Sequence, residues 1–146
     1  MIPHDQYQAI VDALPILCVD LVLTNARGEY LLVKRKNPPL QGQWWVPGGR
    51  VLKGERLAEA AIRKLGEELS LVTLLAGPVG YCEYLLADSP HGSASGHHAV
   101  ALVFTGLVLG GLVELDGQSS DWGFFPTLPH GFTLQGFVND GSVSRT

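Results

Sequence analysis

Hydrophobic and polar residues along the chain are arranged in a pattern that predicts β-strands on both sides of one amphipathic helix. The β-favouring run at 16–24 (ILCVDLVLT) predicts a buried strand, and the turn at 25–28 joins it to a second strand at 29–34 as a hairpin. Further strands are expected at 44–46, over 72–86 as one or two strands interrupted by Gly77-Pro78, at 99–109 and at 121–125.

The predicted amphipathic helix extends from Glu55 to Leu69, where leucine and alanine recur at steps of three and four residues. A short helix is expected at 5–14, with Asp5 as its N-cap and Pro15 ending it, and another near 132–138. Pro47-Gly48-Gly49 predicts a tight turn, and the polar stretch 87–96 a loop. Together these elements predict an α/β (α+β) fold in one domain, 1–146, with a mixed sheet and helices in an α/β/α sandwich.

The composition restricts the functions that this chain can have. The chain has 146 residues, 46% of them hydrophobic and 16% charged, and a net charge of −4. A negative chain is a poor match for the phosphate backbone of nucleic acids, so no nucleic-acid partner is expected. No apolar run approaches the ~20 residues that span a membrane, and no secretory signal precedes the first helix. Two cysteines in apolar runs indicate reduced core residues, and hence a cytoplasmic protein.

The segment from Gly48 to Leu71 contains the candidate chemistry. It combines a double glycine, Glu55, Arg63 and the pair Glu67-Glu68, in the order Gly, five residues, Glu, seven residues, Arg. Adjacent carboxylates at a helix end suit Mg²⁺, which prefers oxygen ligands, although for an isolated pair a solvated charge run is the more common explanation.

This spacing resembles the signature of Nudix hydrolases, which implies a metal-dependent attack on a nucleotide with a diphosphate. The chain departs from the signature at two positions. Lys64 stands where a metal-binding or water-activating Glu is usual, and Ser70 stands where Gly is usual. The resemblance also implies that Glu55 orients Arg63. Arg63 itself either works in the site or pairs with acids on its helix.

A narrower resemblance, over 19–51, is to GDP-mannose mannosyl hydrolases, which also lack the usual Glu at this position and cleave at the anomeric carbon of the sugar. By position, this resemblance implies Mg²⁺ ligands at Glu68, Gly49 and Gln118, beside Glu67, with Mn²⁺ as the alternative metal. It implies site arginines at Arg35, Arg50 and Arg63, of which Arg35 and Arg50 also bind substrate with Asp20.

The chain lacks the residue that this resemblance would assign as the general base. Mannosyl hydrolases have a His directly after the metal-binding Gln, and this chain has Ser119, which is no base at neutral pH without its own activator. Asp121 and His98 are the catalytic candidates that remain, although His98 is equally well explained as a loop histidine. Tyr81 and Tyr84 are candidates for stacking on a nucleobase, whereas the tryptophans are better explained as core residues.

Three hypotheses follow. The first is a Mg²⁺-dependent Nudix hydrolase that releases a free sugar from a nucleoside diphosphate sugar, with GDP-mannose as the first candidate. The second keeps the fold and attacks phosphorus of such a sugar or of a nucleoside triphosphate. The third, motivated by Lys64 and Ser119, is a non-catalytic module that binds nucleotide sugars. A homodimer is expected from the resemblance, with the Trp-rich segments as a suitable interface.

Overall fold

A computed structural model of the chain describes residues 2–37, 39–87, 96–111, 113–115 and 117–137, apart from the side chain of Glu68. Within these residues the chain forms one mixed sheet of eight strands. The strands are β1 (Ile16–Thr24), β2 (Tyr30–Arg35), β3 (Trp44–Trp45), β4 (Gly48–Arg50), β5 (Leu71–Leu86), β6 (His97–Gly111), β7 (Ser119–Phe125) and β8 (Gln135–Gly136).

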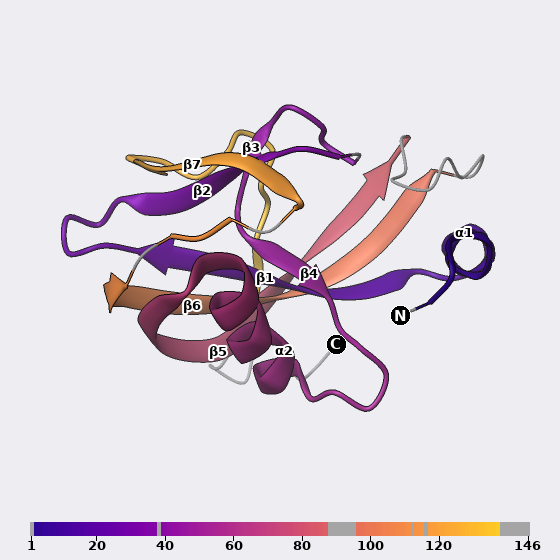
Figure 1. The fold of residues 1–146 in the computed structure, drawn as a ribbon, viewed down its shortest axis with the longest axis horizontal. Coiled ribbons are helices and arrows are strands. Elements are labelled where there is room, and N and C mark those ends of the chain that lie inside the picture. The colour runs from indigo at the N-terminus through magenta and orange to yellow at the C-terminus, as the bar shows by residue number, and fades with distance from the viewer. Residues whose placement is uncertain (1, 38, 88–95, 112, 116, 138–146) are drawn as a thin grey trace.

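The order of the strands places β1 at the centre of the sheet. The main path runs β3-β2-β1-β6-β5-β8, while β4 pairs with β1 and β7 pairs with β2 (Figure 1). β1 and β6 are parallel, and the other recorded pairs are antiparallel. The expected mixed sheet with helices packed on it is therefore confirmed.

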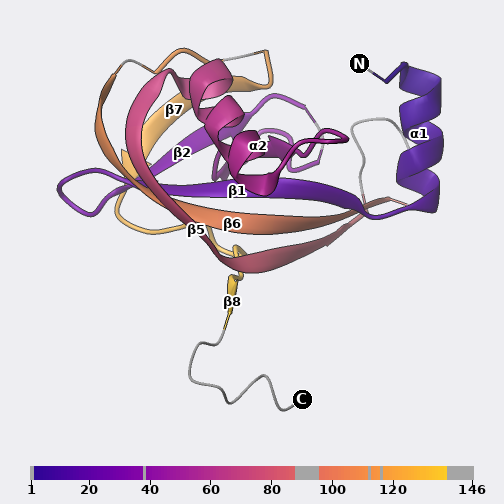
Figure 2. The same cartoon turned by 90° about the horizontal axis from the view of Figure 1, so that it is seen from below.

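The helices occupy different places on this sheet. Helix α1 (His4–Ala13) lies beside the start of β1, whereas α2 (Leu57–Lys64) and the π-helical turn η1 (Leu65–Leu69) lie across one face (Figure 2). The small residues Ala60 and Ala61 of α2 are fully buried, which lets the helix approach the sheet closely. They pack with alternate residues of β1, namely Val19, Leu21 and Leu23. This packing fixes the position of α2 relative to β1 and β4.

The opposite face of the sheet has its own core. Val22, Cys82 and Val103 from three strands are buried there with Trp45 of β3, and the half-buried Phe132 packs against them. Because successive residues of a strand point to opposite faces, β1 contributes to both cores and is buried along most of its length.

Several predictions from the sequence are confirmed in outline. The strand at 16–24 has the predicted bounds, and the helix predicted at 5–14 begins at His4. Asp5 is not its N-cap, because Pro3 stands at that position and Asp5 lies in the first turn. The hairpin is confirmed only at its tip, where Thr24 pairs with Tyr30, since β2 then continues along β7.

Two local predictions are wrong, and a third is confirmed in one of its two forms. Of the one or two strands expected over 72–86, the structure has one, β5, whose pairing with β6 shifts register between Ala76 and Gly80, where the proline cannot donate to the ladder. No helix forms within 132–137, where the short strand β8 pairs with Gly80 and Tyr81 of β5. The expected tight turn at 47–49 is replaced by the start of β4. Most of the loop predicted at 87–96 lies outside the described residues.

Candidate active site

Two glycines let β4 lie between β1 and α2. A Cβ atom on Gly48 would overlap the carbonyl oxygen of Val19 and lie 2.6 Å from Asp20 Oδ1. A Cβ atom on Gly49 would overlap the end of the Lys64 side chain, with Nζ 2.8 Å away. Neither glycine has a positive φ. The pair is therefore required by close approach on both sides of β4 and not by turn geometry.

Asp20 is a buried carboxyl group on β1, with 7% of its surface exposed. Tyr84 of β5 donates its hydroxyl hydrogen to Asp20 Oδ2 at 2.5 Å, and Trp45 Nε1 donates to the Tyr84 oxygen at 3.2 Å. Burial raises the pKa of Asp20 to about 7, while the Tyr84 hydrogen bond and the charge of Arg35 both act to lower it. Asp20 therefore changes its charge near neutral pH.

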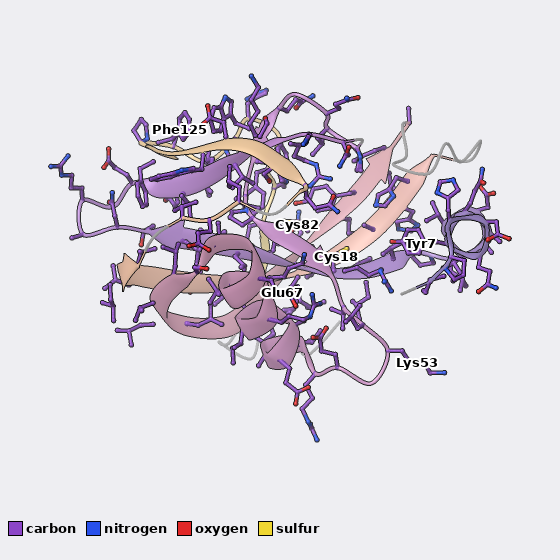
Figure 3. All side chains as sticks on the ribbon, in the orientation of Figure 1. Tyr7, Cys18, Lys53, Glu67, Cys82 and Phe125 are labelled. Carbon is purple, nitrogen blue, oxygen red and sulfur yellow. The ribbon has the colours of Figure 1, made fainter. Side chains whose placement is uncertain are left out.

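Positive charges gather around the first half of β1. Burial and, after it, the charge of the nearby Asp20 raise the pKa of the Cys18 thiol to about 12. Arg50, Arg35 and Lys64 act on the same thiol in the opposite direction, so all three lie within electrostatic reach of it. Figure 3 shows Cys18 beside β4.

The two arginines of this group are held by neutral partners. Arg35 Nε donates to the carbonyl oxygen of Pro39 at 2.7 Å, and the Arg50 guanidinium lies 5.1 Å from the centre of the Tyr7 ring. Among the described residues, neither arginine has a carboxylate within 4.0 Å. A protein of net charge −4 therefore contains a local site that is suited to an anion.

Arg63 connects the loop before α2 to β4 and to η1. Its Nε and Nη2 atoms donate to the Glu55 carboxylate at 2.6 and 3.0 Å, and Nη2 also donates to the carbonyl oxygen of Arg50 at 3.0 Å. Its Nη1 atom donates to Glu67 Oε2 at 3.3 Å. These hydrogen bonds raise the pKa of Arg63, chiefly through Glu55. Of the two explanations open from the sequence, this geometry favours pairing within the helix region, with Arg63 as a positioning residue.

Glu55 and Glu59 each have a defined structural contact. Glu55 Oε1 also accepts a hydrogen bond from the backbone of Leu52, and together with Arg63 this lowers the pKa of Glu55 to about 2. Glu59 accepts from the backbone N–H of Arg56 at 3.0 Å and so satisfies a donor at the start of α2. Glu59 is thus an exposed helix residue that also caps the start of α2.

The candidate metal ligands lie on different elements. Glu67 is on η1 with 61% of its side chain exposed, beside Arg63 (Figure 3), and Gly49 is on β4. Gln118 precedes β7, where its side-chain oxygen lies 3.5 Å from Asn37 Nδ2. The Glu68 side chain lies outside the described parts. In the portion of the chain that is described, no three His, Cys, Asp or Glu side chains converge as a metal cluster.

The candidate bases are exposed, and Ser119 is buried. His98 lies on β6 opposite Leu85, and Asp121 lies on β7, where it accepts a hydrogen bond from the backbone of Trp122 at 2.8 Å. Ser119 is 8% exposed and pairs in the sheet with Arg35. The serine that replaces the expected histidine is therefore a neighbour of a site arginine.

The side chain of Tyr81 does not point toward Asp20. It is three residues before Tyr84 on β5, and since alternate residues point to opposite faces, its side chain points away from the face on which Tyr84 meets Asp20. Its ring packs near Phe137, with centroids 6.1 Å apart. The sequence makes both tyrosines candidates for stacking on a nucleobase, but no spacing in it indicates the hydrogen bond between Tyr84 and Asp20.

Comparisons with known proteins agree with this geometry. The family profile described as "NUDIX domain" matches residues 14–128. The chain is 35% identical over 119 residues to the low-salt glycan biosynthesis protein Agl8 of Haloferax volcanii. The aligned region covers 82% of this chain and 76% of that protein. It is 32% identical over 111 residues to the ADP-ribose pyrophosphatase of Methanocaldococcus jannaschii, covering 76% of this chain and 62% of that protein.

Solved structures show the same fold. A MutT NUDIX hydrolase from Burkholderia pseudomallei superposes with a TM-score of 0.63 at 26% identity, over 80% of this chain and 91% of that chain. The NUDIX domain of Shewanella oneidensis NrtR, crystallised with ADP ribose, superposes with a TM-score of 0.59 at 23% identity. The match covers 86% of this chain and 84% of that chain. At this identity the second similarity concerns the fold alone.

Proposed function

Because the chain belongs to the NUDIX domain family and is a hydrolase of that kind, we propose that it hydrolyses a nucleoside diphosphate sugar, with GDP-mannose as the first candidate. The bond broken is the one between the anomeric carbon and the diphosphate oxygen, so the products are a free sugar and a nucleoside diphosphate. Agl8, the relative in glycan biosynthesis, is consistent with a sugar-containing substrate.

The observation behind this proposal is the cationic site around Cys18. Arg35, Arg50 and Lys64 reach one region of β1 from β2, β4 and α2. A diphosphate leaving group gains negative charge as its bond to the sugar breaks, and fixed cations stabilise that charge most in the transition state. In this proposal Arg35 and Arg50 bind the diphosphate, and Arg63 holds Arg50 and Glu67 in place.

Lys64 favours attack at carbon over attack at phosphorus. Its ammonium group lies at Gly49, in a position where related enzymes use a carboxylate to activate water. A cation there cannot accept a proton from that water. Water attack on an oxocarbenium-like anomeric carbon depends less on a strong nucleophile and more on departure of the leaving group.

We propose that the site holds a single Mg²⁺ ion with few protein ligands, with Mn²⁺ as the alternative. Glu67, Glu68, Gln118 and the carbonyl of Gly49 would hold it, since Mg²⁺ prefers oxygen ligands and keeps several waters. When bound, the ion supplies positive charge to the diphosphate. The exposed carboxylate of Glu67 is accessible for this role.

Asp20 joins Asp121 and His98 as a proposed participant in proton transfer. Its pKa of about 7 is suited to a general base at neutral pH, whereas Asp121 and His98 face solvent on β7 and β6. Tyr84 orients the Asp20 carboxylate through its hydrogen bond. This arrangement gives the site a titratable group in place of the histidine that Ser119 replaces.

Attack at phosphorus is the second candidate, and the ADP-ribose pyrophosphatase relative supports it. Incubation with GDP-mannose in water labelled with ¹⁸O, followed by NMR and mass spectrometry, separates the two. Labelled mannose with unlabelled GDP is the expected result. GMP with mannose 1-phosphate would replace the carbon mechanism by the second candidate. Absence of turnover for GDP-mannose and for ADP-ribose, with measurable binding, would identify a binding module.

We also propose that two copies of the chain associate through β5 and β6. Val72, Leu74, Leu107 and Leu109 expose between 40% and 62% of their surface, and Leu74 pairs with Leu107 in the sheet. No charged residue occurs between Leu71 and Cys82. In a two-fold contact a surface meets itself, so a charge-free surface is the one that avoids repulsion between negative copies.

Of the Trp-rich segments, the one at 44–45 offers little surface for an interface, whereas Trp122 is 41% exposed. Trp45 is 9% exposed and donates a hydrogen bond to Tyr84, and Trp44 packs on Phe125 with ring centroids 4.9 Å apart.

Among the helices in the described ranges, none has the length and apolar character that crossing a bilayer requires. The cytoplasmic location stays a prediction.

A further inference from the structure

Lys64 has an unusual position for the last residue of a surface helix. Its side chain is half-buried and extends from α2 to β4, where its end fills the space beside the Cα atom of Gly49. An alanine at position 49 would overlap Lys64 Cε. The missing side chain of Gly49 therefore provides the room in which the Lys64 ammonium group lies.

Two of the acids near Lys64 are paired with another residue. Glu55 and Glu67 both pair with Arg63, and these are the ion pairs recorded among the described residues. Among the described side chains, which do not include that of Glu68, Lys64 has no carboxylate within 4.0 Å. Its positive charge acts to lower the pKa of Glu55, and it opposes the rise in the pKa of Cys18. A half-buried ammonium group at this place stabilises an anion that binds beside it.

We infer that Lys64 binds a phosphate oxygen of the substrate directly and takes the place of one divalent cation in this site. The inference rests on the proposed function, since it requires a ligand with a diphosphate group. A lysine contacts phosphate as a point charge through three rotatable donors, and the space over Gly49 allows that contact. The diphosphate is then bound by Lys64, Arg35 and Arg50 even when no metal is present.

Binding of inorganic pyrophosphate and of GDP, measured by calorimetry in EDTA, tests this role without any need for turnover. The wild-type chain is expected to bind both ligands in EDTA. Lys64→Met is expected to weaken this binding about tenfold or more, because one charge-assisted contact is lost. Lys53→Met is the matched control, since Lys53 is exposed on the loop before α2, away from β4 (Figure 3), and is expected to change affinity less than about twofold.

Lys64→Glu provides an independent readout through the metal. This variant restores a carboxylate beside Gly49, so it is expected to bind Mn²⁺ more tightly than wild type by electron paramagnetic resonance, and to lose pyrophosphate binding in EDTA. Circular dichroism melts confirm that each variant is folded.

The outcomes separate this inference from the proposed function. Equal pyrophosphate affinity of wild type and Lys64→Met in EDTA would overturn the role of Lys64, and so would wild-type binding that appears only when Mg²⁺ is added. No binding of pyrophosphate or GDP by wild type in either condition would instead overturn the proposed function. Unchanged Mn²⁺ affinity in Lys64→Glu would show that Lys64 does not occupy a cation position.

Discussion

Asp20 is a residue whose burial opposes its own ionisation. The carboxyl group ionises near 3.8 in the unfolded chain and near 7 in the folded chain, where Tyr84 and Arg35 face it. Between these values the folded chain keeps a proton that the unfolded chain has lost, so this group makes stability fall as pH rises from about 4 to about 7.

The substitution Asp20→Asn is expected to remove the decrease in stability that Asp20 causes as pH rises. Relative to wild type, the free energy of unfolding of the variant should increase between about pH 5 and about pH 8, by an amount on the order of a few kcal/mol. Urea denaturation at the two pH values measures it. Tyr84→Phe is the control in the opposite direction, because loss of the hydrogen bond disfavours the carboxylate further. Parallel pH curves for wild type and Asp20→Asn would contradict the shifted ionisation.

Ser70 ends η1 in a left-handed conformation, with φ of 48°. Left-handed backbone costs a residue with a Cβ atom roughly 1–2 kcal/mol, and glycine avoids this cost. Ser70→Gly is therefore expected to stabilise the chain by about 1 kcal/mol, after allowance for the greater freedom of glycine in the unfolded chain. A thermal melt measures the shift. Ser70→Ala keeps the strain and loses the bond to the Gly66 carbonyl, so a gain in that variant would argue against backbone strain as the cause.

The loop from 51 to 56 and helix α2 are joined by the pair of Glu55 and Arg63. The pKa of Glu55 is lowered to about 2, chiefly by the Arg63 hydrogen bond, so its carboxylate stabilises the fold above its ordinary value of 4.5. This contribution is lost as pH falls from about 4.5 towards 2.

Glu55→Gln is expected to lower stability at neutral pH and to lower catalytic rate, because Arg63 then holds Arg50 and Glu67 less firmly. The difference in stability from wild type should shrink as pH falls below about 4. Denaturation across this pH range and steady-state kinetics at neutral pH measure the two effects. Glu59→Gln is the control, since an amide oxygen still accepts from the Arg56 backbone. A stability difference independent of pH would rule out the ion pair as the source.

The whole molecule exposes a charge-free surface on β5 and β6, and this surface predicts how copies associate. Leu74→Lys is expected to convert a dimer into a monomer, because two ammonium groups would meet across the two-fold axis. Size-exclusion chromatography with light scattering measures the mass. Leu85→Lys is the matched control, because Leu85 is 75% exposed at the other end of β5. A monomeric wild type would remove the proposed dimer, and a Leu74→Lys dimer would move the interface elsewhere.

How much the sequence predicted depended on how local the deciding interactions were. The strand at 16–24 was predicted with its bounds, because eight of its nine residues are apolar or β-branched, with Asp20 as the exception, and leave few alternatives. The irregularity at Gly77-Pro78 was predicted at its place, but the sequence left open one or two strands, because pairing with β6 on both sides decides that β5 is a single strand. The helix near Phe132 was wrong because the edge of β5 offers partners to Gln135 and Gly136.

The sequence by itself determined the family, the central strand and the helix with its acids, because motif spacing and hydrophobic period are properties of neighbouring residues. Only the tertiary structure decided that Tyr84 meets Asp20, since the two residues are 64 positions apart in the chain. Only the tertiary structure, likewise, decided that the Lys64 side chain lies against Gly49. That contact depends on how closely Ala60 and Ala61 let α2 approach the sheet, and packing of this kind is set by the whole core.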